Sequence, residues 1–156
     1  MTVHESKQTL QKSVDRVKRI LERTPEERLL WSPAPAARTP LAQVVHVATV
    51  IQHIHAMMMG NRFPYRTGEE ADAEFRTFEK SITRREDALS LLEKHSTALI
   101  EWLDQLPAES LSVVVPLPFD REGPLELLLG GPAKHTNDHA AQMDYIQTCY
   151  DDRAWT

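Results

Sequence analysis

The stretch that decides the fold is TPLAQVVHVATVIQHIHAMMMG, residues 39–60. Thr39 suits the N-cap of a helix, Pro40 suits its first position, and Gly60 stands where a C-terminal cap is expected. From Leu41 to Met59 there is no Asp, Glu, Lys or Arg, over a length close to that of a membrane-spanning helix. The glutamines and histidines inside the stretch are costly in lipid. The sequence therefore predicts the most buried helix of a water-soluble bundle and no membrane partner.

Outward from this helix, three more segments have helical periodicity. Val3, Leu10, Val14, Val17 and Leu21 fall on one stripe of the first segment, and further helices are predicted at about 84–106 and 132–150. A short helix is expected at 26–31. Four long amphipathic segments predict an all-α four-helix bundle with a long crossover and at most a short extended segment. We expect residues 1–156 to form a single domain, with 151–156 as a looser tail.

Two connections carry their own predictions. The segment 61–83 is long for a loop inside a compact domain, and loops of this length are often functional. Its acidic part, 69–79, is expected to form a turn or two of helix. The segment 111–119 is β-branched and then proline-rich, which predicts a short edge strand or an extended crossover. Residues 120–123 are predicted to form a turn.

Composition narrows the class of protein. The chain has 156 residues, 41% of them apolar, which suits a globular interior, and a formal charge of −5 disfavours a broad nucleic-acid interface. Cys149 is the only cysteine, so no intramolecular disulfide forms, and we expect it to be a small core residue. The first residues lack the apolar core of a signal peptide. The sequence therefore predicts a cytoplasmic protein.

The histidines carry the chemistry. His135 and His139 are four residues apart on the last helix, so their side chains share one face and can converge on one metal ion. His46, in the uncharged helix, is the best candidate for a third ligand. Gln142 continues the His135–His139 face, and His53 lies about 10 Å along its helix from His46, so both are candidates for lining a pocket.

Another interpretation stays open for each of these residues. A histidine pair at this spacing arises often by chance, and a single buried histidine is commonly a hydrogen-bonded core residue. Asp138 lies between the two ligands in sequence but points about 100° away from each, as expected of a surface group or of a carboxylate that supports a ligand imidazole. Acidic residues of 69–79, and Glu126, are further candidates for the mouth of the site.

The same residues, in this order, resemble the DinB / YfiT-like superfamily of metal-dependent proteins. One histidine follows a proline-rich loop, here Trp31-Ser32-Pro33-Ala34-Pro35 and then His46. The last helix has an H-x-x-x-H-x-x-Q stretch, here His135 to Gln142. The resemblance extends over nearly the whole chain and implies a three-histidine metal site made of His46, His135 and His139.

Three neutral histidine ligands leave coordination positions for water or substrate, the open arrangement of a catalytic metal. The leading hypothesis is an enzyme that uses a divalent metal (Zn, Ni or Mn) as a hydrolase or thiol transferase, with metal-bound water or a low-molecular-weight thiol acting on a small molecule. The rivals are a non-catalytic metal- or ligand-binding stress-response bundle and an interaction module with structural histidines. A homodimer is also expected, partly from Trp155 near the end of the chain.

Overall fold

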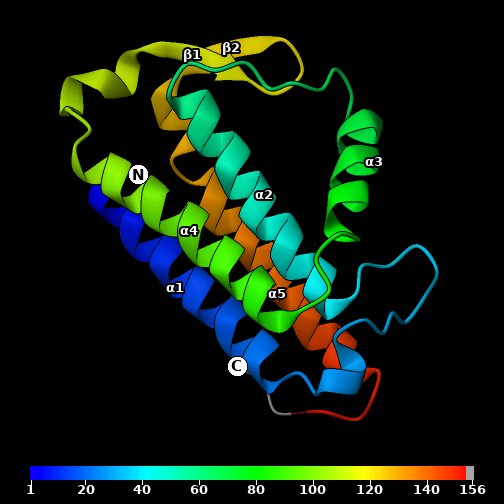
Figure 1. The fold of residues 1–156 in the computed structure, drawn as a ribbon. Coiled ribbons are helices and arrows are strands. Elements are labelled where there is room, and N and C mark those ends of the chain that lie inside the picture. The colour runs from blue at the N-terminus through cyan, green and yellow to red at the C-terminus, as the bar shows by residue number, and fades with distance from the viewer. Residues whose placement is uncertain (154–156) are drawn as a thin grey trace.

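Four long helices lie side by side in the computed structural model, which describes residues 1–153 (Figure 1). They are α1 (Val3–Arg23), α2 (Pro40–Met58), α4 (Arg85–Asp104) and α5 (Gly131–Thr148). The predicted all-α four-helix bundle is confirmed, and the three helices with predicted bounds, α2, α4 and α5, begin and end within about two residues of them.

Each helix of the bundle has one parallel and one antiparallel neighbour. The colour gradient in Figure 1 shows α1 and α5 running in one direction and α2 and α4 in the other. The closest packing joins α2 to α4 and α1 to α5, and the contacts of α2 with α5 and of α1 with α4 close the ring. Its core consists of aliphatic side chains that are almost wholly buried, among them Leu10, Ile20, Leu41, Ile51, Leu92, Leu99 and Met143.

Helix α2 is the central helix, as its sequence predicts. The Thr39 hydroxyl accepts a hydrogen bond from the backbone N–H of Ala42 at 3.1 Å, Pro40 starts the helix, and Gly60 follows it with a φ of +89°. A positive φ is costly for residues with a Cβ, which explains the glycine there. The side chains from Val44 to Ala48 are all buried. The first half of α2 therefore has almost no solvent face and needs no charged residues.

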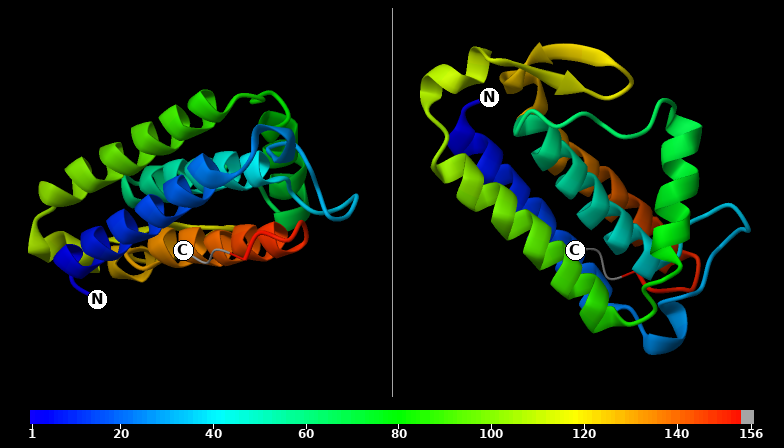
Figure 2. Two further views of the ribbon diagram at one scale, coloured as in Figure 1. Left: turned by 90° about the horizontal axis from the view of Figure 1, so that it is seen from below. Right: turned by 45° about the horizontal axis from the view of Figure 1, so that its top comes forward.

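The connection between α2 and α4 contains a longer helix than the sequence analysis predicts. Helix α3 (Gly68–Glu79) is capped by the Thr67 hydroxyl, which accepts from the Glu70 N–H at 3.1 Å. Its buried residues are Ala71, Phe75 and Glu79, at intervals of four. This narrow stripe packs α3 against α2 and stabilises three turns instead of one or two. Figure 2 shows α3 beside α2, outside the four-helix bundle.

A two-stranded hairpin crosses one end of the bundle (Figure 2). Strand β1 (Val114–Leu117) lies inside the predicted extended segment and pairs antiparallel with β2 (Arg121–Pro124). The predicted turn at 120–123 is wrong, because the reversal comes earlier, at Phe119 and Asp120, which both have positive φ. Short 3₁₀ helices, η1 (Glu26–Arg28), η2 (Ala108–Ser112) and η3 (Leu125–Leu128), complete the connections.

Two further expectations meet the structure at the C-terminal end. Cys149 is exposed instead of lying in the core, because it follows the last turn of α5, beyond the helices that cover the inner face. Trp155, part of the reason for expecting a homodimer, lies outside the described residues, and the homodimer stays a prediction. Among residues 1–153, no helix is long and apolar enough to cross a membrane.

We expect Thr39→Ala to lower the free energy of unfolding by about 1 kcal/mol, because it removes the cap of α2. Chemical denaturation of the purified protein measures this. Thr77→Ala is the matched control: Thr77 is exposed within α3, so its removal is expected to leave stability nearly unchanged. Equal losses in both variants would contradict this role for Thr39.

Candidate metal centre

Three histidines from two helices come together in the interior of the bundle. His46 lies on α2, and His135 and His139 lie one turn apart on α5. One ring nitrogen of each lies within 4.8 Å of those of the other two. The ring centroids are 4.4 Å apart for His135 and His139, 4.7 Å for His46 and His139, and 5.1 Å for His46 and His135. The structure thus brings together all three residues that the sequence singles out.

A buried carboxylate orients His46. The Nδ1 atom of His46 lies 3.0 Å from Oε1 of Glu79, at the end of α3. An ionised carboxylate only accepts hydrogen bonds, so Nδ1 carries the proton and Nε2 keeps its lone pair. Arg38 in turn holds Glu79: its Nε lies 2.9 Å from both carboxylate oxygens. The Glu79 side chain is only 3% exposed, so its charge depends on these two partners.

An amide orients His139 in the same way. The Nδ1 atom of His139 donates to Oε1 of Gln43, which lies one turn before His46 on α2. The Nε2 atom of His139 therefore also keeps its lone pair. In His135, Nε2 is buried and has no hydrogen-bond partner among the described residues. A buried polar atom without a partner is costly, and a metal ion beside it would remove that cost.

The electrostatics of the site favour neutral imidazoles. Burial, together with the neighbouring His46, lowers the pKa of His135 to about 4. Burial, with His135 and His46 nearby, lowers the pKa of His139 to about 3. Both rings are therefore uncharged at pH 7, the form in which imidazole is a metal ligand.

The residues fit a divalent metal that is intermediate between hard and soft, such as zinc. Three imidazole nitrogen donors from two helices leave at least one coordination position without a protein ligand, as in catalytic zinc sites. Hydrogen bonds to the far ring nitrogens of two of the three are the usual supporting arrangement of metal-ligating histidines. Ligation itself stays a prediction at this point.

The remaining candidates fall in different places. His53 is half-buried and stacks among aromatic rings, with centroids 5.3 Å from Phe75 and 5.7 Å from Tyr65. Phe75 also contacts His46, at 5.5 Å, so His53 is connected to the cluster through the Phe75 ring. Asp138 is exposed and bonds to Lys134 at 2.7 Å, so it is a surface group and Glu79 is the supporting carboxylate.

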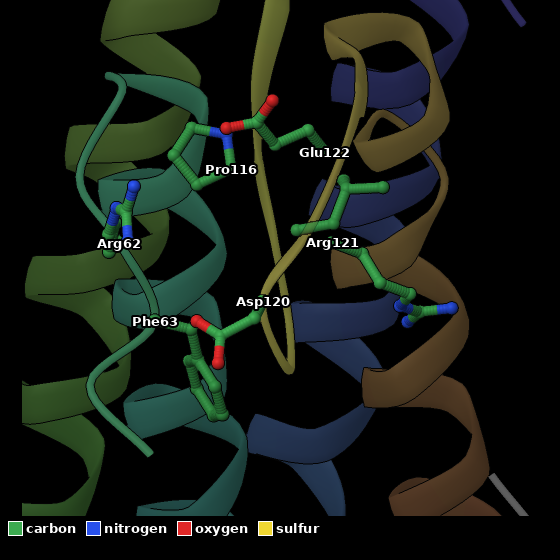
Figure 3. A pocket seen from close by; sticks show the side chains of 7 residues that line it. Arg62, Phe63, Pro116, Asp120, Arg121 and Glu122 are labelled. Carbon is green, nitrogen blue, oxygen red and sulfur yellow. The ribbon is translucent and has the colours of Figure 1, made fainter. Parts of the chain in front are cut away.

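Gln142 is exposed and lines a cavity on the side of the cluster where Gln43 lies. A second pocket, between the segment after α2 and the hairpin, is shown in Figure 3, where Phe63 and Asp120 are two of the residues that line it. None of the seven residues that line this second pocket belongs to the histidine cluster.

Sequence reasoning missed Gln43 and Arg38 and included Glu79 only as one of several candidate acids. Gln43 could have been predicted from the sequence, because it is a polar residue one turn from His46 in a helix with few polar groups. Glu79 was only one of several acids in 69–79, and Arg38 was unremarkable in a proline-rich loop. Their roles depend on how the loop and α3 fold back onto α2, which no local pattern encodes.

The fold and the histidine cluster agree with the protein family that a comparison with family models identifies. A family model described as the DinB superfamily matches residues 9–143. The chain belongs to the DinB superfamily. The resemblance inferred from the sequence is confirmed, and no curated protein sequence matches the chain.

Solved structures share the DinB fold. YfiT from Bacillus subtilis, described as a probable metal-dependent hydrolase with an unusual four-helix bundle topology, is 16% identical with a TM-score of 0.75, over 99% of this chain and 89% of YfiT. The mycothiol-dependent maleylpyruvate isomerase is 16% identical with a TM-score of 0.69, over 92% of this chain and 61% of its own. The colibactin self-resistance protein ClbS, solved in complex with a dsDNA, is 14% identical with a TM-score of 0.70, over 95% of this chain and 96% of its own.

We expect Glu79→Gln to weaken Zn²⁺ or Ni²⁺ binding by about 10–100-fold, because an amide holds the His46 Nδ1–H less strongly than a carboxylate does. Titration against a chelator of known affinity measures this. Asp138→Asn is the matched control, since it neutralises an exposed acid beside the same histidines. Equal affinities for Glu79→Gln and the wild type would contradict the supporting role of Glu79.

Proposed function

We propose that this DinB-superfamily protein binds one divalent metal through His46, His135 and His139 and uses it as an enzyme on a small molecule. The observation that carries the proposal is the arrangement of the three imidazoles. Two have their Nδ1 atoms engaged by Glu79 and Gln43, and the third has a buried Nε2 without a partner among the described residues. One ring nitrogen of each lies within 4.8 Å of those of the other two, close enough for one metal ion to bind all three.

The chain's own residues prepare the site. Arg38 and Glu79 hold the His46 ring, and Gln43 holds the His139 ring. Burial keeps His135 and His139 unprotonated, so no proton competes for their lone pairs near neutral pH. A bound Zn, Ni or Mn ion would supply Lewis acidity, which polarises a substrate and acidifies a coordinated water or thiol.

Two reaction classes agree with this site. The DinB fold is found in YfiT, described as a probable metal-dependent hydrolase, and in an isomerase that depends on mycothiol, a low-molecular-weight thiol. We therefore propose hydrolysis or thiol transfer. The alternative is a bundle that binds metal or a ligand without turnover. The carboxylate beside the cluster, Glu79, is engaged by Arg38 and His46, and activity measurements on the metal-loaded protein distinguish turnover from binding alone.

We further propose that the substrate is a small molecule and not nucleic acid. The net charge of −5 disfavours many phosphate contacts. ClbS shares the fold and was solved with dsDNA, so duplex DNA belongs in the binding tests of this chain. Weak, strongly salt-dependent binding of duplex DNA, or none, is the result that agrees with a small-molecule substrate.

The untagged protein, purified without chelator, is expected to carry about one equivalent of Zn, Ni or Mn per chain. His135→Ala is expected to lose this metal and to stay folded, because the His135 Nε2 makes no hydrogen bond that the substitution would break. Mass spectrometry of bound metals and circular dichroism measure the two results. His95→Ala, which removes a half-buried histidine on α4, is the control. An absence of metal in the wild type, even after reconstitution, would overturn the proposal.

Activity is tested with a panel of esters, amides and thiol conjugates on the metal-loaded protein. We expect turnover that falls at least about 100-fold in His135→Ala and returns on adding metal to stripped wild type but not to the variant. Metal binding without turnover of any member would favour the non-catalytic alternative.

A further inference from the structure

A cavity of about 570 Å³ lies beside the histidine cluster, on the side of Gln43. The proline-rich loop (33–38) forms one wall, α5 forms another, and α3 contributes Arg76. Its volume falls within the range of small-molecule sites. A smaller cavity of about 310 Å³, lined in part by Arg38, Arg76 and Glu79, also shares residues with the hydrogen bonds of the cluster.

The charged side chains that line this cavity are two arginines, and the other polar side chains are Gln43, Gln142 and Tyr145. Arg38 and Arg76 line it, whereas their carboxylate partners Asp72 and Glu79 do not. The ion pairs hold the two guanidinium groups in place: Arg38 lies 2.5 Å from Asp72, and Arg76 lies 2.7 Å from the same carboxylate. The described lining contains no acidic residue. Two guanidinium groups that acids outside the lining hold in place, with no acid in the lining itself, offer hydrogen-bond donors to an anion, above all a carboxylate.

The rest of the lining is mostly apolar. The exposed ring of Tyr145 lies at the rim. The walls consist of small or aliphatic residues, namely Pro33, Ala36, Ala37, Ala141 and Ile146. Apolar walls with a few convergent polar groups are the usual composition of a site for an organic molecule. An inorganic anion would leave these walls unused.

Two residues connect the cavity to the cluster. Gln43 lines the cavity and accepts the hydrogen bond from His139. Gln142 also lines the cavity and interacts with the His139 side chain. A molecule in the cavity therefore contacts side chains that contact a predicted metal ligand.

We propose that this cavity binds a small organic carboxylate, with the carboxylate on Arg38 and Arg76 and the apolar body against the loop and α5. This inference rests on the proposed function in one respect: it names the substrate class of the metal site as a carboxylate-bearing molecule. The carboxylate binding itself needs no metal, because both arginines are held by protein groups.

The test uses phenylacetate as the probe and phenylacetamide as its uncharged counterpart, titrated into the full chain and followed by NMR. We expect phenylacetate to bind the metal-free and the metal-loaded protein at least about tenfold more tightly than the amide. Arg76→Gln is expected to remove this preference. Arg121→Gln, which neutralises an exposed arginine in the hairpin, is the control and is expected to keep it.

A second variant tests whether phenylacetate binds inside the cavity or elsewhere on the surface. Ala141→Phe fills the cavity from an exposed position on α5, so it is expected to abolish phenylacetate binding without unfolding the protein. In Co²⁺-loaded wild type, phenylacetate is expected to shift the visible absorption through Gln43 and His139. Equal binding of acid and amide, no binding, or a preference unchanged in both Arg76→Gln and Ala141→Phe would overturn the proposal.

The two proposals can fail separately. A protein that takes up no metal but still prefers phenylacetate, with the preference lost in Arg76→Gln, would overturn the metal site and keep the carboxylate site. A protein that takes up one metal but binds acid and amide equally would overturn the carboxylate site and keep the metal centre.

Discussion

The buried carboxylate of Glu79 is the constraint on which the site depends. A charge that is 3% exposed is tolerated only with partners, and Glu79 has two, the Arg38 guanidinium and the His46 ring. Arg38 belongs to the proline-rich loop, Glu79 to α3 and His46 to α2. One set of charge-assisted hydrogen bonds therefore ties the end of α3 to the loop and to α2, 41 and 33 residues earlier in the chain, and fixes the tautomer of His46.

This constraint explains why α3 exists where it does. Its buried face is narrow, and two of the residues on it contact His46. The Phe75 ring packs against the His46 ring, and the Glu79 carboxylate accepts a hydrogen bond from it. The helix therefore supports the histidine cluster as much as the bundle core. The same loop and helix also supply Arg38 and Arg76 to the adjacent cavity, so metal site and cavity share their supporting residues.

The sequence predicts the bundle well because its signals are local. The uncharged run after Thr39-Pro40, and the four-residue spacing of His135 and His139, each follow from the geometry of one helix. His46 was found because a histidine in so apolar a helix needs a partner. Glu79, Arg38 and Gln43 act through contacts between segments, which periodicity does not encode. Cys149 and the hairpin reversal at Phe119 were misplaced for a related reason, since both lie where a regular pattern ends.

The central claim is that His46, His135 and His139 converge on one metal ion. X-ray absorption spectroscopy of the metal-loaded, untagged protein tests it most directly. The account predicts three imidazole nitrogens at about 2.0–2.1 Å, completed by oxygen ligands and without sulfur. A sulfur scatterer from Cys149, or a first shell with fewer than two imidazoles, would show that the metal binds elsewhere and would contradict the account.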